Sequence, residues 1–158
     1  MGSPTVTPVT GIPIDYDESY ANAGVYHPEG FIHKIASSIL PSVFPPGGSI
    51  TVNPKNTADV NKVITHESVH GLLNGLDASG QLQQLNSQNP YYSKIASAIT
   101  DSQGGDPSTE APAYAATGET SQLKGVNPII SQQYRDTLLK QLLKLDPNIG
   151  KMYQQLMK

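Results

Sequence analysis

The stretch that decides the fold is TADVNKVITHESVHGLLNGL, residues 57–76. Its apolar residues recur at helical spacing and form a broad stripe at positions 60, 63, 64, 69, 72, 73 and 76. Thr57 is a suitable N-cap, Asp59 favours the first turn through the helix dipole, and Gly75 suits the C-terminal end. The pattern therefore predicts one helix over residues 57–76.

Two histidines lie one turn apart within this predicted helix. His66 and His70 point the same way, so both imidazoles can reach one tetrahedral zinc ion. Glu67 lies about 100° round the helix from His66, too far round to ligate but within reach of a water that needs a base. This H-E-x-x-H pattern predicts a zinc site with Glu67 as general base. The alternative, two structural histidines, is disfavoured because polar groups on such an apolar helix are costly without a purpose.

The motif and its context resemble the zinc metallopeptidases of the zincin fold. In that fold an edge strand precedes the H-E-x-x-H helix, and substrate lies antiparallel along this strand; here SITVNP, residues 49–54, precedes the helix. The metzincin type continues with a glycine and a third histidine. Here Leu73 occupies the glycine position, and no histidine follows His70. A downstream carboxylate must complete the ligand set, which is similar to the gluzincin type and most like its small single-domain members.

The resemblance implies a third ligand on a helix packed against the motif helix. Glu110 is the expected ligand, because the small residues of TEAPAYAA, 109–116, allow close approach. Glu119 is the alternative, and Asp101 and Asp106 lie at a workable distance in a Gly-rich loop. A glutamate in a first turn also serves as a partner of the helix dipole, so a purely structural role for Glu110 stays open.

The chain departs from thermolysin-like members at one position. They carry an aspartate four residues after the ligand glutamate, where this chain has Tyr114. Another group must then orient the imidazoles, and the candidates are Asp77, Asp136 or a backbone carbonyl.

Peptide hydrolysis also needs a second donor for the developing oxyanion. With no later histidine, we expect a tyrosine: Tyr114, one turn from Glu110, or Tyr134, on the next long helix. Arg135, Tyr91 and Tyr92 are further candidates.

The rest of the chain predicts an α+β fold. The expected strands lie within residues 12–26 and 49–53, and the other expected helices at 29–40, 79–86, 90–100, 108–117, 127–145 and the C-terminus. The prediction is a mainly helical, zincin-like fold with a small N-terminal mixed β-sheet, a central H-E-x-x-H helix and a downstream glutamate helix. Residues 1–11, which open with Met-Gly-Ser and are rich in Pro and Thr, are expected to be a flexible tag or linker, and residues 12–158 a single domain.

The composition limits the classes of partner and the metal ligands that we expect for this chain. Only 15% of residues are charged and the net charge is −3, so no basic field recruits nucleic acid or anionic lipid. No apolar run approaches the roughly 20 residues of a membrane helix. Because there is no cysteine, a metal must use histidine and carboxylate ligands. The neutral, polar composition favours an extracytoplasmic or secreted protein, and we expect a monomer.

Two functions are compatible with this pattern. The first is a zinc-dependent metalloendopeptidase that uses one catalytic Zn²⁺ to cleave peptide or protein substrates, with Glu67 as general base. The second is a catalytically inactive zincin-fold domain that binds or scaffolds a partner and retains the zinc. The first requires Glu67 for hydrolysis and the second does not.

Overall fold

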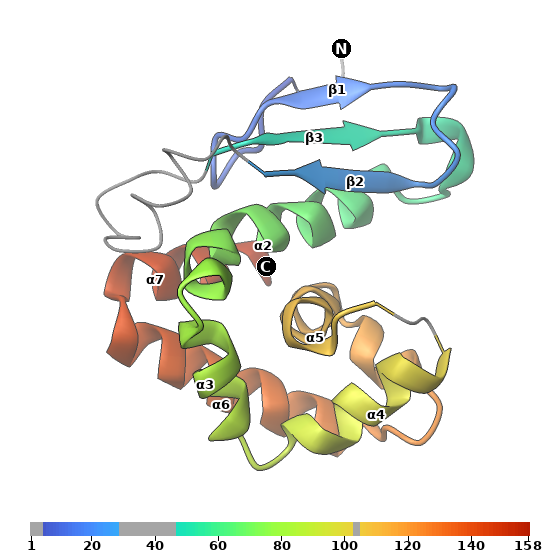
Figure 1. Cartoon of the computed structure of the whole chain (residues 1–158). Helices are drawn as coiled ribbons and strands as arrows, with labels where there is room; N and C mark the ends of the chain where they lie inside the picture. The colour runs from blue at the N-terminus through green and yellow to red at the C-terminus, as the bar shows by residue number, and fades with distance from the viewer. Residues whose placement is uncertain (1–4, 29–46, 103–104) are drawn as a thin grey trace.

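The structure is a computed structural model that describes residues 5–28, 47–102 and 105–158. A small sheet lies on one side of α2, and the remaining helices gather on the other side, with α5 in their midst (Figure 1). The strands are β1 (Ile14–Tyr16), β2 (Gly24–His27) and β3 (Ser49–Val52). The helices are α2 (Val60–Ala78), α3 (Gln81–Ser87), α4 (Tyr92–Ser102), α5 (Pro107–Thr117), α6 (Pro128–Leu145) and α7 (Pro147–Leu156), with short 3-10 helices η1 (Pro54–Asn56) and η2 (Glu119–Gln122). The protein is thus α+β and mostly helical, as predicted.

The three strands form a mixed sheet in the order β1-β3-β2. β3 pairs parallel with β1 and antiparallel with β2, in the register Gly24 to Val52 and His27 to Ser49. The expectation that the strand before the motif helix is an edge strand is therefore wrong, because β3 is central. The edge strand that packs on α2 is β2 (Figure 1).

The motif helix α2 begins and ends later than its sequence pattern predicts. Asp59, not Thr57, is the N-cap, and its side chain accepts a hydrogen bond from the backbone N–H of Lys62 at 3.0 Å. At the other end Gly75 is buried inside the helix, and Ser79 is the C-cap. The helix runs on because Leu76 is also buried, so its last turn gains packing that an early stop would forfeit.

Helix α2 separates two apolar cores. Ile64 faces the sheet and packs with Ile12, Ile14, Ile50 and Val52. The opposite side carries Val69, Leu72, Leu73 and Leu76 into the larger core of the helices. Both faces of α2 are therefore held by packing, and the side chains between the two faces have fixed positions.

Most of the other predicted elements are confirmed within a few residues. The helix expected at 29–40 falls outside the described residues. Part of the expected tag or linker, residues 5–11, makes contacts with the start of the domain predicted from residue 12. Thr7 is 2% exposed, its backbone N–H donates to Ile12 O at 2.9 Å, and Val6 bridges to Pro13.

Candidate metal centre

Three potential ligands converge where α2 meets α5. Nε2 of His70 lies 2.9 Å from Oε1 of Glu110, and Nε2 of His66 lies 3.3 Å from Oε2 of the same carboxylate. The two Nε2 atoms are 3.3 Å apart. One ligand atom from each of the three side chains lies within 4.8 Å of the others. The structure thus brings together the two histidines and the glutamate that were predicted as metal ligands from the sequence.

Helix α5 carries Glu110 in its first turn. Asp106 caps the helix and accepts a hydrogen bond from the backbone N–H of Ser108 at 3.0 Å. Pro107 occupies the first turn, where its missing N–H costs nothing. Beyond Glu110 the alanines on the buried face let α5 approach its neighbours closely: Ala111, Ala113, Ala115 and Ala116.

A proline inside α5 is accommodated by side chains from other helices. Pro112 cannot donate to the carbonyl of Ser108, and Nδ2 of Asn86 donates to that carbonyl instead at 3.0 Å. Asn86 is held in turn by the hydroxyl of Tyr134, which donates to Oδ1 at 2.9 Å. The carbonyl of Pro112 accepts from the buried hydroxyl of Tyr153 at 2.8 Å. These bonds fix α5, and with it Glu110, against α3, α6 and α7.

The donor set fits a divalent ion that accepts nitrogen and oxygen ligands. Two imidazole nitrogens and one carboxylate form the three-ligand set of a catalytic zinc site, with a position left for water or substrate. The side chains of His66 and His70 are 13% and 14% exposed, so the group lies near the surface. This arrangement could hold a metal ion.

The acid–base properties of the group follow from its contacts. Burial lowers the pKa of His66, but the hydrogen bonds with Glu110 and Glu119 outweigh it and raise that pKa to about 9. Burial raises the pKa of Glu110, but the hydrogen bonds with His66 and His70 outweigh it and lower that pKa to about 2. In the metal-free protein His66 is therefore protonated at neutral pH, and its positive charge faces the carboxylate of Glu110.

Glu119 meets the other nitrogen of His66. The chain turns sharply at Gly118, whose φ of +81° is open to glycine, and η2 then brings Glu119 back toward α2. Oε1 of Glu119 lies 3.5 Å from Nδ1 of His66 and accepts a hydrogen bond from the hydroxyl of Thr117 at 2.5 Å. A carboxylate on Nδ1 fixes the imidazole so that Nε2 faces the ion. Glu119 therefore lies on the side of His66 away from the three converging ligand atoms, where it could orient the ring.

The two aspartates expected to orient the imidazoles bond to glutamine side chains instead. Asp77 accepts a hydrogen bond from Gln83 at 2.5 Å, and Asp136 accepts one from Gln132 at 2.8 Å. Neither aspartate is bonded to a histidine among the described residues.

Glu67 projects from α2 toward β2. Its Cγ is close to Gly24 of β2, where an added Cβ would lie 3.5 Å away, and its carboxylate receives a hydrogen bond from the backbone of Tyr26. Burial raises the pKa of Glu67, and the nearby imidazoles of His66 and His70 oppose this. A carboxylate with a raised pKa is better matched to taking a proton near neutral pH.

The two tyrosines predicted as oxyanion donors lie in different parts of the structure. The ring of Tyr114 lies 5.0 Å from the ring of His66, and burial together with Glu110 and Glu119 raises the pKa of Tyr114 to about 12. Its hydroxyl therefore keeps its proton at neutral pH. Tyr134 is fully buried and its hydroxyl donates to Asn86, so the structure places it in the core and not beside the ligand group.

Arg135, Tyr91 and Tyr92, the further candidates for the oxyanion donor, make their contacts in other parts of the protein. Nε of Arg135 contacts Sδ of Met157 at 3.0 Å, near the C-terminus. Tyr91 and Tyr92 pack against the helical core. Tyr114 is thus the tyrosine that the structure places against a histidine of the ligand group.

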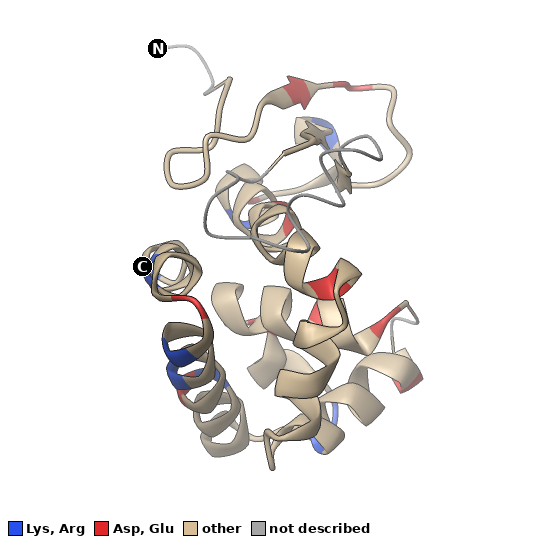
Figure 2. Ribbon diagram, turned by 60° about the vertical axis from the view of Figure 1, so that its left-hand side comes forward, with Lys and Arg blue, Asp and Glu red and all other residues tan. Residues whose placement is uncertain are grey.

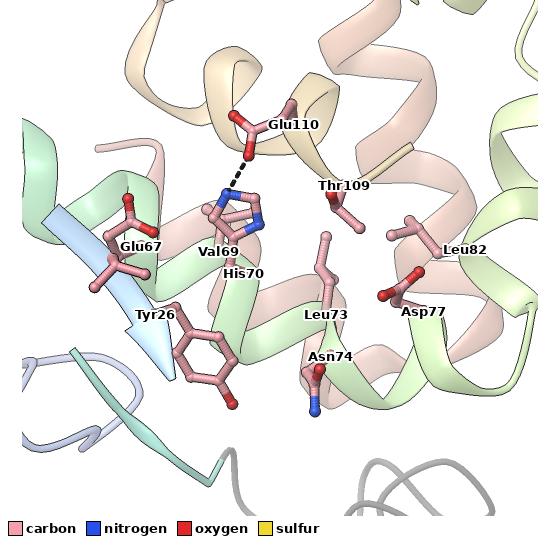
Figure 3. A pocket seen from close by; sticks show the side chains of 11 residues that line it. Tyr26, Glu67, Val69, His70, Leu73, Asn74, Asp77, Leu82, Thr109 and Glu110 are labelled. Atoms are coloured by element: carbon pink, nitrogen blue, oxygen red, sulfur yellow. Dashed lines mark ion pairs between the residues drawn. The ribbon is translucent and has the colours of Figure 1, made fainter. Parts of the chain in front are cut away.

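Two pockets flank Glu67, one on each side of the ligand group. The His70 pocket has a volume of about 290 Å³ and is lined by Val25, Tyr26, His70 and neighbouring residues of α2, α3 and α5 (Figure 3). The His66 pocket has a volume of about 470 Å³ and is lined by residues 22–24, His66, Tyr114 and Glu119, among others. Both are lined by Glu67 and by residues of β2, and we refer to the two pockets together as the cleft.

The lysines and the arginine of the described residues are spread over several elements rather than gathered on one (Figure 2). Among residues 5–28, 47–102 and 105–158, no helix combines the length and apolarity that crossing a bilayer requires.

Comparison with known proteins adds nothing to this geometry. No family model, curated protein or solved structure matches the chain.

Proposed function

We propose that the protein is a zinc-dependent metalloendopeptidase of the gluzincin type. The proposal depends chiefly on one observation: two histidines of one helix turn and a glutamate 40 residues along the chain present their ligand atoms within 4.8 Å of one another. Glu67, which does not ligate, lies beside this group and lines both pockets of the cleft. This is the division of roles that the H-E-x-x-H pattern requires.

A peptide is the substrate that best suits the cleft. In the antiparallel pair of β2 and β3, Asn53 N–H donates to Ala23 O at 2.9 Å, so alternate residues of β2 direct their backbone groups toward β3. The backbone groups of Gly24 and Tyr26 consequently face the other way, where the backbone N–H of Tyr26 donates to the carboxylate of Glu67. No described strand pairs with β2 on that side. An extended peptide can lie there and pass Glu67 and the ligand group.

Each residue of the site has a distinct task in hydrolysis. His66, His70 and Glu110 would hold the zinc ion, which when bound would supply Lewis acidity for the scissile carbonyl and lower the pKa of water toward about 7. Glu67 takes a proton from the attacking water and delivers it to the leaving amine. The protonated hydroxyl of Tyr114 is the candidate donor to the developing oxyanion.

The decisive experiment is hydrolysis of a mixed peptide library by the zinc-loaded protein, analysed by mass spectrometry. We expect cleavage that a chelator abolishes and that Glu67→Gln reduces at least 100-fold while zinc stays bound. Glu18→Gln is the matched control, because the same chemical change then falls on an exposed glutamate that is paired with Lys55. Full activity in Glu67→Gln would refute the mechanism. Stoichiometric zinc without any cleavage would favour the inactive binding domain.

A further inference from the structure

The His70 pocket has apolar walls. Leu73, Val69 and Leu82 contribute side chains that are 2%, 0% and 0% exposed, and β2 lines the pocket with Val25 and Tyr26. The walls come from four elements, since α5 adds Thr109 beside Glu110 (Figure 3). The pocket therefore suits a side chain with a long apolar stem.

Three carboxylates line the same pocket, and Asp77 is the one that belongs neither to the ligand group nor to the expected general base. Asp77 lies across the pocket from Glu67 (Figure 3). Gln83 fixes the aspartate, because its Nε2 donates to Oδ1 of Asp77 at 2.5 Å and also reaches Oγ of Ser108 at 3.4 Å. No lysine or arginine lines the pocket, and no ion pair to Asp77 occurs among the described residues. The charge of Asp77 is thus left for a ligand to balance.

The other pocket has a different charge. The His66 pocket is lined by Lys62 as well as by Glu119. The carboxylates of Glu67 and Glu119 in the His66 pocket are thus partly balanced by Lys62, whereas no lysine or arginine balances the carboxylates of the His70 pocket.

The direction of β2 relates the two pockets to the ends of a substrate. Gly24, at the start of β2, lines the His66 pocket, and Tyr26, farther along, lines the His70 pocket. A peptide that lies antiparallel to β2 places the residues before its scissile bond beside Tyr26. The His70 pocket then receives a side chain from the N-terminal side of the scissile bond.

We infer that the His70 pocket selects lysine or arginine on the N-terminal side of the scissile bond. The methylene stem lies against Leu73 and Leu82, and the cationic head lies at Asp77. This inference rests on the proposed peptidase function, and it adds a substrate class to it.

The test measures binding rather than turnover. Acetylated, amidated hexapeptides of alanine that carry lysine, norleucine or glutamate at one position, scanned along the peptide, are titrated into zinc-loaded Glu67→Gln protein. Norleucine is the matched probe, because it keeps the stem of lysine and lacks the charged head. The backbone amide signals of Leu73, Asn74 and Leu82 report in NMR spectra whether the pocket is filled.

Asp77→Asn is compared with Asp136→Asn in this background. Both changes remove one negative charge from an aspartate that accepts a hydrogen bond from a glutamine side chain, but Asp136 is on α6. We expect the affinity ratio of the lysine peptide to the norleucine peptide to fall roughly fivefold to tenfold in Asp77→Asn. Asp136→Asn should leave the ratio unchanged.

The outcomes separate this inference from the function on which it rests. An unchanged lysine-to-norleucine ratio in Asp77→Asn, or the absence of peptide binding with shifts at these three amides, overturns the inference. Library cleavage with no enrichment of lysine or arginine before the cut also overturns it while leaving the peptidase intact. Charge-selective binding through Asp77 without cleavage by the wild-type protein upholds the pocket and refutes the peptidase.

Discussion

Zinc binding should expel a proton, because His66 holds one in the metal-free protein. Its hydrogen bonds with Glu110 and Glu119 raise its pKa to about 9 against the opposing effect of burial. A zinc ion requires the neutral imidazole, so the ion and the proton compete for the same Nε2. At pH 7 only about one molecule in a hundred carries the neutral form, and this competition costs about 2.7 kcal/mol of apparent binding free energy.

The expected pH dependence has a definite sign and size. Apparent zinc affinity should rise about tenfold per pH unit from pH 7 to pH 8, and should level off above pH 9. Competition with a chelator of known affinity measures this slope. Isothermal titration calorimetry at pH 7.5 in two buffers of different ionisation enthalpy should give about one proton released for each ion bound.

Two results would refute the reasoning. The first is a zinc affinity that stays flat between pH 7 and pH 9, and the second is calorimetry that detects no proton release. Either would mean that the imidazole of His66 is already neutral, and hence that its contacts with Glu110 and Glu119 do not hold a proton there.

The contacts around the site support three more predictions. Glu119→Gln should weaken zinc binding about tenfold at pH 9, where proton competition is small, because Nδ1 loses its carboxylate; chelator competition measures this, and equal affinity would argue against an orienting role. Gly24→Ala should destabilise the fold by about 1–3 kcal/mol in urea unfolding, since its Cβ would lie 2.5 Å from Cγ1 of Val63, and adding Val63→Ala should recover most of the loss if this clash is the cause. Tyr114→Phe should lower kcat about tenfold or more with zinc retained, whereas Tyr134→Phe should keep kcat and lose about 1–2 kcal/mol of stability; the reverse pattern would exchange their roles.

The sequence predicts the parts of the site that depend on local periodicity. Helix spacing places His66 and His70 on one face before any fold is known, and the small residues around Glu110 identify a helix able to pack closely. Neither inference depends on how distant segments of the chain pair.

The misplaced features depend on distant contacts or on competition between neighbouring residues. The position of β3 inside the sheet depends on its pairing with both β1 and β2, and no local pattern specifies that order. The role of Glu119 depends on the turn at Gly118, which returns the chain to α2.

The case of Tyr134 is different, because a usable signal is present in the sequence. Tyr134, Leu138 and Leu142 follow one another at intervals of four, and all three are completely buried. Continuing the leucine stripe of the predicted helix back by one turn would have assigned this tyrosine to the core rather than to the site.

The ligand geometry has a consequence for the unfolded chain. His70 and Glu110 are about 40 residues apart, and the chain contains no cysteine with which to form a covalent cross-link. A metal ion shared by α2 and α5 would close that loop much as a disulfide does. For a loop of this length, the lower entropy of the denatured ensemble corresponds to about 4 kcal/mol of stabilisation of the folded state. The ion would then serve as a clasp on the tertiary structure, and the lifetime of the folded protein would depend on how much metal its surroundings supply.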